Sequence, residues 1–450
     1  MRSVVNRPGD YWTGPFLDLL AVGLGIAFVW AFVLSSYFGV NLPQSLVFLS
    51  SDGWCPPGAN GLGAHCWGDF AAVGNFTFTD TPQGPESPYQ MSSRVLRVPF
   101  AVVWQMAGFG VALTAYLVVV TACLLAPIVW ATRSLPLARR LMAIMVAAVA
   151  TTPFLYALDR GNSVALAVPF VLLFGWGLLR DRMLWAVIGV VIASSVKPQY
   201  AFLMVAFIAL RRWWPLMSAL LGVGLTFILP YFALGGGWVE GLKEWVRASQ
   251  AWSTGQPLWV DWPANHSFAK ALFDATHWLG QSFPGSALNT TPDRWAALCT
   301  LAATAFVLIA GTALAAFGGR LNRVEVVAVA LALACLAVPL AFGYYAVFAL
   351  VTVGLLIGAE RTSAGEPPVV PPTRAWALSA ALLVTLTPVL LPRGDLLAAD
   401  EGQALVVASW MPTLSTLAWM CFIGVTLTSA ARSKARDVST AREVTSAPLP

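Results

Sequence analysis

Long apolar runs, separated by short segments that carry the charged residues, constrain this chain more than any other feature of its sequence. The first run, Pro15 to Tyr37, exceeds the roughly 20 apolar residues that a helix needs to cross a bilayer. No small-residue cleavage site is evident near it, so we expect it to be retained as a helix. Charged residues make up only 10% of the 450-residue chain, whereas an ordinary soluble domain carries about 25%. The sequence therefore predicts an all-α polytopic membrane protein.

The apolar runs predict about twelve membrane spans in a single domain over residues 1–430, followed by a polar, disordered cytoplasmic tail over 431–450. The predicted spans are 15–37, 104–131, 141–157, 163–179, 183–196, 200–210, 216–234, 296–317, 324–341, 345–359, 375–392 and 403–430. The fifth and sixth are shorter than a normal span. We expect them to form a pair that dips into the membrane and meets at Lys197-Pro198.

The distribution of Lys and Arg predicts that both termini lie in the cytoplasm, because basic residues concentrate in cytoplasmic loops. Every even-numbered span then ends at a basic cluster, as at Arg139-Arg140 and Arg211-Arg212. The net charge of +5 therefore reflects topology and gives no indication of nucleic-acid binding. Two long segments, 40–98 and 235–295, fall outside, and loops of this length are usually functional. Residues 238–247 predict an amphipathic helix on the outer leaflet, or a loop helix packed on the protein.

Polar residues gather at the predicted outer helix ends, where lipid would not tolerate them without a reason. Arg160 and Lys197 are cations at these ends, and Asp69 lies in the first outer loop. The other candidates are Asp159, Asn162, Gln199, Asn265, His266, Tyr344 and Tyr345. Taken singly, Asp159 and Arg160 could merely pair with each other, and Lys197 could extend to the interface. Their presence on one side favours a shared site.

Such a site suits a lipid-linked phosphate. Arg160 and Lys197 would hold the phosphate by charge-assisted hydrogen bonds, and Asp69 could accept the proton of an attacking hydroxyl. Asp69 could alternatively cap a following helix. The remaining polar and aromatic candidates would contact sugar or acceptor. The sequence contains no Gly-rich phosphate loop and no zinc-ligand spacing, so no metal or cofactor is expected.

Cys55 and Cys66 share the first outer loop, while the other four cysteines lie in apolar runs. If that loop faces an oxidising compartment, we expect a disulfide between them. The alternative is two free thiols.

The order of these motifs resembles that of glycosyltransferase family 87, the bacterial polyprenyl-phosphate-mannose-dependent mannosyltransferases of GT-C type. The resemblance rests on Gly68-Asp69, Arg160-Gly161-Asn162, Lys197-Pro198-Gln199 and Asn265-His266-Ser267. The segment from Pro339 to Tyr345 takes the place of the family's Ser-Pro-X-Ser-Trp-X-His motif but lacks its His, with Tyr344 and Tyr345 nearby.

The resemblance implies a GT-C fold with periplasmic amphipathic helices and a site facing outward from the plasma membrane. It implies inverting transfer of a sugar, most simply mannose or else arabinofuranose, from a polyprenyl-phosphate donor to a glycolipid or cell-envelope glycan, without a metal. Two other classes stay open: a secondary transporter of a small solute, because about twelve spans is a common transporter number, and a non-catalytic scaffold.

Overall fold

The computed structural model describes residues 98–233, 265–282, 292–338, 343–360, 372–387 and 410–446, with Ala341 and single residues between 22 and 33 and between 239 and 250. These residues are almost entirely helical and contain no β-strand. The first half comprises α5 (Val98–Ala107), α6 (Phe109–Thr132), α7 (Leu137–Ala150), α8 (Thr152–Arg160), α9 (Val164–Leu179), α10 (Met183–Val196), the 3-10 helix η3 (Pro198–Met204), α11 (Val205–Ala209) and α12 (Trp213–Ala233). The second half comprises α14 (Phe268–Ser282), α15 (Pro292–Phe317), η6 (Gly318–Arg320), α16 (Arg323–Leu336), η7 (Gly343–Val347), α17 (Phe348–Glu360), α18 (Pro372–Leu386) and α19 (Met411–Ser446).

Several of these helices are apolar enough to cross a membrane, which confirms the prediction of a helical membrane protein in its coarse form. In the described part of the chain, three helices are long enough to span by themselves: Phe109–Thr132, Arg294–Arg320 and Met411–Ser433. The bent pair of α7 and α8 would be a fourth. The shorter apolar helices, among them α9, α10, α12, α17 and α18, coincide with further predicted spans. The prediction of twelve spans thus stays a prediction.

Two predicted spans are interrupted in the structure. Gly108 adopts the positive φ of 86° between α5 and α6, at the start of the predicted span 104–131. Helices α7 and α8, predicted as one span over 141–157, are bent by 66° at Thr151. Thr151 has extended dihedrals (φ −114°, ψ 123°), and Pro153 stands in the first turn of α8. A proline fits there because its missing N–H would have no partner inside the helix.

The first helix of the predicted short pair has the expected bounds, whereas the second, predicted over 200–210, consists of a 3-10 helix and a short α-helix over 198–209. Helix α10 ends at Val196, Lys197 is extended, and the 3-10 helix η3 begins at Pro198. After η3, α11 continues only to Ala209. The structure therefore confirms two short helices that meet at Lys197-Pro198, while their depth in a membrane stays a prediction.

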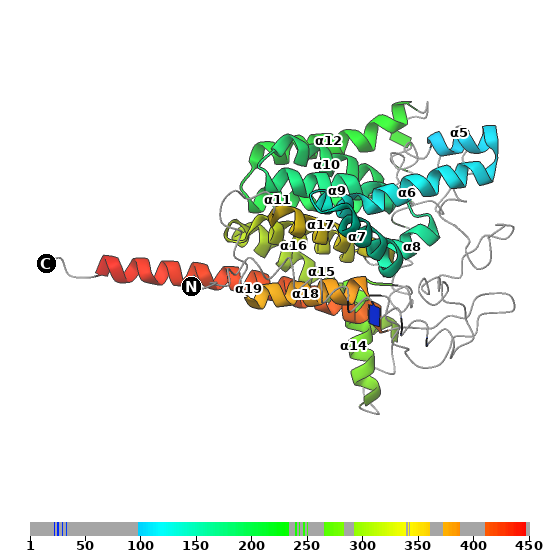
Figure 1. Ribbon diagram of the computed structural model, residues 1–450. Helices are drawn as coiled ribbons and strands as arrows, with labels where there is room; N and C mark the ends of the chain where they lie inside the picture. Colours follow the sequence, from blue (N-terminus) through cyan, green and yellow to red (C-terminus); the bar gives the residue numbers. More distant parts are fainter. Residues whose placement is uncertain are drawn as a thin grey trace, which may run out of the picture.

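The last helix differs from the sequence prediction. Helix α19 continues to Ser446 and so covers most of the segment for which composition predicts disorder. Half of the residues from Ala431 to Ser446 are Ala, Arg, Lys or Glu, which are good helix formers even where no packing supports them. In Figure 1 the end of α19 projects beyond the rest of the bundle.

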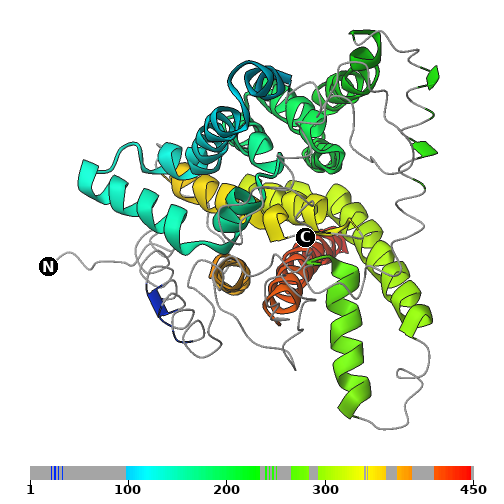
Figure 2. The same cartoon turned by 90° about the vertical axis from the view of Figure 1, so that its right-hand side faces the viewer.

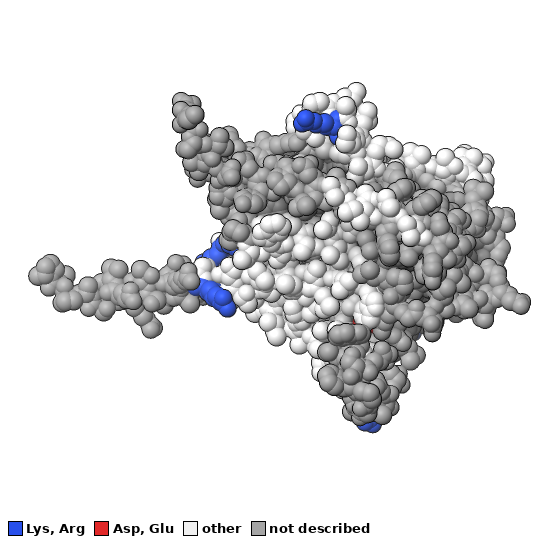
Figure 3. Space-filling view, turned by 60° about the horizontal axis from the view of Figure 1, so that its bottom comes forward, with Lys and Arg blue, Asp and Glu red and all other residues white. Residues whose placement is uncertain are grey.

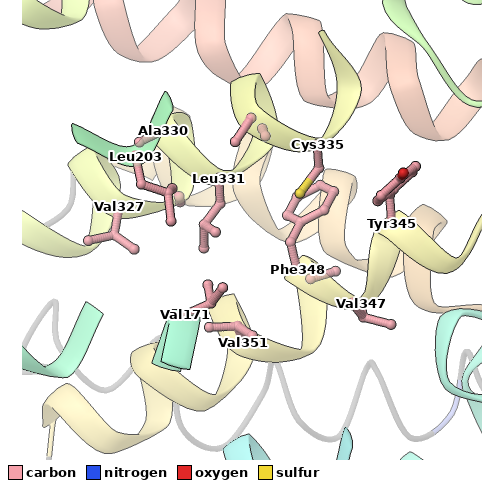
Figure 4. Close-up of a cluster of buried hydrophobic side chains, with 14 of the residues drawn as sticks. Val171, Leu203, Val327, Ala330, Leu331, Cys335, Tyr345, Val347, Phe348 and Val351 are labelled. Atoms are coloured by element: carbon pink, nitrogen blue, oxygen red, sulfur yellow. The ribbon is translucent and has the colours of Figure 1, made fainter. Parts of the chain in front are cut away.

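Helix α16 lies at the centre of the bundle. Every residue from Val324 to Leu336 is buried, so this helix is covered on all sides by α9, α11, α15, α17 and η3. Figure 4 shows side chains of α16, such as Leu331 and Cys335, among those of Leu203, Phe348 and Val351. From Val326 to Leu336 this helix is apolar all round, as is expected only in the core of a large or membrane protein.

Three segments that were predicted to lie on the cytoplasmic side meet at one end of the bundle. Asp181, between α9 and α10, accepts from Arg212 at 2.7 Å and lies 3.6 Å from Arg323. Arg323 also donates to the Leu178 carbonyl at 2.7 Å, at the C-terminus of α9. Nearby in sequence, Glu325 of α16 pairs with Arg374 of α18 at 3.0 Å. These contacts bring segments 178–182, 212 and 323 together at one end of the bundle, and the side of a membrane that this end faces stays a prediction.

The described surface is mostly apolar. Met106, Trp214 and Ile309 are 82%, 80% and 70% exposed, and the described atoms in Figure 3 are almost all uncharged. Within the predicted outer amphipathic helix, Val239, Glu240, Lys243, Val246 and Arg247 are helical and exposed; the other residues of that prediction lie outside the described residues. A surface of this kind fits lipid better than water.

Candidate functional site

Lys197 is the central cation of the candidate site. It caps the C-terminus of α10, where its backbone N–H donates to the Ala193 carbonyl at 3.0 Å. Its side chain is buried, and Nζ lies 5.7 Å from the centre of the Tyr345 ring. A cation over an aromatic face is attracted by the ring quadrupole. Two predicted site residues, 148 positions apart in sequence, are thus brought together.

Asn265 and His266 are joined to the segment that leads to Tyr345. The His266 backbone N–H donates to the Ala341 carbonyl at 2.5 Å. Asn265, which is wholly buried, accepts on Oδ1 from the backbone N–H groups of Ala341, at 3.0 Å, and Ser267, at 2.9 Å. This oxygen therefore holds the backbone, whereas the sequence had suggested Asn265 only as a sugar contact.

Ser267 begins α14. Its Oγ accepts from the backbone N–H of Lys270 at 3.2 Å, which satisfies one of the donors left open at a helix N-terminus. Figure 1 shows α14 running across the direction of the bundle helices, and Figure 2 shows it from its side while α18 is seen along its axis. The Asn-His-Ser sequence is thus the turn that directs this cross-running helix.

Gln199 and His266 each carry a buried nitrogen, Nε2, without a hydrogen-bond partner. Burial lowers the pKa of His266 from 6.5 to about 4, so its imidazole is neutral at physiological pH. Buried polar atoms are nearly always satisfied in folded proteins. The two unsatisfied nitrogens of Gln199 and His266, in segments adjoining Lys197 and Tyr345, are therefore candidates for contact with a bound molecule.

Residues 159–162 adjoin the same region. Gly161 ends α8 with a left-handed φ of 60°, and its carbonyl accepts from the Tyr116 hydroxyl at 2.9 Å. Asn162 is buried, and its Oδ1 accepts from the Val164 N–H at 2.8 Å at the start of α9. Helix α8 packs against η7, the short helix that contains Tyr344 and Tyr345. The side chains of Asp159, Arg160 and Tyr344 lie outside the described part, so their predicted roles are not tested by contacts.

Lys270 and Asp274 form a buried ion pair that the sequence analysis missed. Their side chains are only 3% and 2% exposed, and Lys270 Nζ lies 2.7 Å from Asp274 Oδ1. The second oxygen of Asp274 accepts from Thr413 of α19 at 2.5 Å. Their i,i+4 spacing was a usable signal, because such pairs face each other on a helix. Only the burial, which sequence does not report, distinguishes this pair from a solvated one.

Asp69, Cys55 and Cys66 lie outside the described residues, so the predicted base and disulfide stay predictions. Within the described part, no group of three or more His, Cys, Asp or Glu residues could hold a metal ion. What the described residues supply is a buried cation on an aromatic ring and two uncommitted polar nitrogens in adjoining segments. Such groups can bind an anion next to a hydroxylated, uncharged group.

No family model, no curated protein and no solved structure matches this chain.

Proposed function

We propose that the protein is a membrane glycosyltransferase that transfers a sugar, most simply mannose, from a polyprenyl-phosphate donor to a glycolipid or cell-envelope glycan. Transfer takes place at the outer face of a bacterial plasma membrane, with inversion at the anomeric carbon. The polyprenyl chain lies in lipid beside the helices, while its phosphate reaches the polar groups at the helix ends. A donor of this kind already carries its phosphate leaving group.

The observation that carries this proposal is the contact between Lys197 and Tyr345, with Gln199 and His266 in the adjoining segments. Lys197 supplies a positive charge at the end of an apolar bundle, where it meets a lipid-linked phosphate at headgroup depth. The neutral Nε2 atoms of Gln199 and His266 suit sugar hydroxyls, which are uncharged.

The chemical step needs two further groups. Arg160, at the end of α8, assists Lys197 in neutralising the departing phosphate. Asp69, from the first outer loop, takes the proton of the acceptor hydroxyl as its oxygen attacks the anomeric carbon. The bond between that carbon and the phosphate oxygen breaks, and polyprenyl phosphate leaves with the electron pair.

Reconstitution into proteoliposomes tests this function against transport. Vesicles would contain purified protein, radiolabelled polyprenyl-phosphate mannose and an envelope lipid extract as acceptor source. Protein-dependent appearance of label in a new lipid or glycan, with release of polyprenyl phosphate, is expected. Uptake of a soluble sugar into the lumen without any such transfer would instead support the transporter.

A further inference from the structure

The buried ion pair on α14 links this helix to the last helix of the bundle. Asp274 binds Lys270 through Oδ1 and Thr413 of α19 through Oδ2. Removing two charges from water costs free energy that their mutual attraction does not always recover. A buried ion pair is therefore poor evidence that the pair stabilises the fold. Its geometry, in contrast, is specific. With all three side chains buried, the network allows α14 to dock on α19 in one register.

A second bond, one helical turn further along α19, holds the start of α14. The Thr416 hydroxyl donates to the His266 carbonyl at 2.8 Å. Thr413 and Thr416 are three residues apart and therefore lie on the same face of α19. One face of α19 thus contacts α14 at two points. Thr413 binds Asp274 in the middle of α14, and Thr416 binds His266 just before α14 begins.

From His266 the contacts continue to the candidate site. The His266 N–H and the Asn265 Oδ1 bind the two backbone groups of Ala341. Ala341 precedes η7, whose Tyr345 ring lies under Lys197 Nζ. These hydrogen bonds thus connect α19, the start of α14 and the segment before η7, which are widely separated in sequence. Because each bond includes a backbone group, the three segments cannot shift independently.

We propose that Lys270, Asp274 and Thr413 are positioning residues, which dock α14 on α19 and thereby fix His266 and the Tyr345 segment at the candidate site. They do not contact the substrate. The positioning itself is a property of the fold, and only its effect on sugar transfer rests on the proposed function.

Thr413→Val tests the coupling with little change of shape, because it removes only the hydroxyl that binds Asp274. Thr413→Ser, which restores the hydroxyl, is the rescue. Thr385→Val is the matched control, because it also removes a buried threonine hydroxyl that contacts α19. The Thr385 hydroxyl lies 2.7 Å from the Ser415 hydroxyl and accepts from the Trp419 side chain at 2.8 Å. Hydrogen–deuterium exchange of the full chain in lipid nanodiscs reports each backbone segment separately.

In Thr413→Val we expect exchange to become roughly tenfold faster in peptides covering Asn265–Lys270 and Gly343–Val347, as loss of one hydrogen bond to a charged group allows. Thr413→Ser should restore the wild-type rates, and Thr385→Val should leave both peptides unchanged. Faster exchange confined to α19, or an equal effect of Thr385→Val on the two peptides, would overturn the proposal.

A neutral double variant, Lys270→Met with Asp274→Leu, removes the acceptor of the Thr413 hydroxyl and guards against misfolding because it leaves no unpaired buried charge. It should accelerate the same two peptides, and unchanged exchange there would also overturn the proposal. In the transfer assay, Thr413→Val should raise the KM for the donor several-fold more than it lowers kcat, with rescue by Thr413→Ser. If exchange responds as expected and the wild-type protein transfers no sugar, the proposed function fails and the positioning stands.

Discussion

Replacing Gly189 with alanine should disrupt the packing of α9 against α10. A Cβ atom at this position would lie 2.5 Å from the Phe170 carbonyl oxygen and 2.6 Å from the Phe174 backbone nitrogen. Ordinary contact begins near 3.4 Å, so the two helices would have to separate by about 0.9 Å. Both obstructing atoms belong to the α9 backbone and cannot rotate away. Overpacking of a tight core typically costs about 1–3 kcal/mol of folding free energy.

Gly224→Ala in α12 is the matched control, because nothing lies within 4 Å of the Cβ it would add. Alanine favours a helix over glycine by about 0.8–1 kcal/mol, so this variant should be neutral or slightly stabilised. Thermal unfolding of both variants in the same detergent checks the difference in sign. If Gly189→Ala melts at or above the wild-type temperature, α9 and α10 do not approach as closely as described.

Three further predictions concern the outer segments. Burial lowers the pKa of His266 to about 4 in the folded protein, while the unfolded chain keeps a pKa near 6.5. As the pH falls from 6.5 to 4, the unfolded state therefore takes up the proton first. The free energy of unfolding should fall by up to about 1.4 kcal/mol per pH unit over this range and be constant below it. His266→Gln should flatten that part of a pH-dependent melting profile, and an identical profile would contradict the assignment. Cys55 and Cys66 should resist thiol labelling under denaturing, non-reducing conditions, whereas efficient labelling of both would exclude the disulfide. Asp69→Asn should lower the rate of sugar transfer by about 10²–10⁴-fold with donor affinity retained; near wild-type turnover would mean that another carboxylate is the base.

The positions of many helices could be predicted because burial in lipid or in a helical core demands long apolar runs. Helix α10 has the predicted bounds, and α9 differs by one residue at its start. The bend at Thr151 was missed because hydropathy averages over a window and does not report backbone direction. The extension of α19 to Ser446 was missed because polar composition was taken to mean disorder, although half of the residues in the extension are good helix formers.

The candidate site could be predicted only in part. Lys197 and Tyr345 were both selected, since each stands at a helix end on the predicted outer side, and the structure brings them together. Asn265 was also selected, but its bonds to Ala341 could not be foreseen because they join segments that are far apart in sequence. Lys270 and Asp274 were overlooked because their i,i+4 spacing does not distinguish a buried ion pair from an ordinary exposed pair on a helix.

The most direct measurement of the central claim compares Lys197→Met with Lys243→Met in binding and turnover of polyprenyl-phosphate mannose. Methionine retains the length of the side chain and removes its charge. Lys243, in the predicted outer segment 235–295, is exposed and pairs with Glu240 at 2.8 Å, so it controls for loss of a positive charge on the same predicted side. Loss of a charge-assisted bond of about 1.5–3 kcal/mol should weaken donor binding by roughly 10–100-fold in Lys197→Met. Lys243→Met should bind the donor and transfer sugar like the wild type. Equal donor affinity and equal turnover in the two variants would contradict the claim that Lys197 holds the donor phosphate.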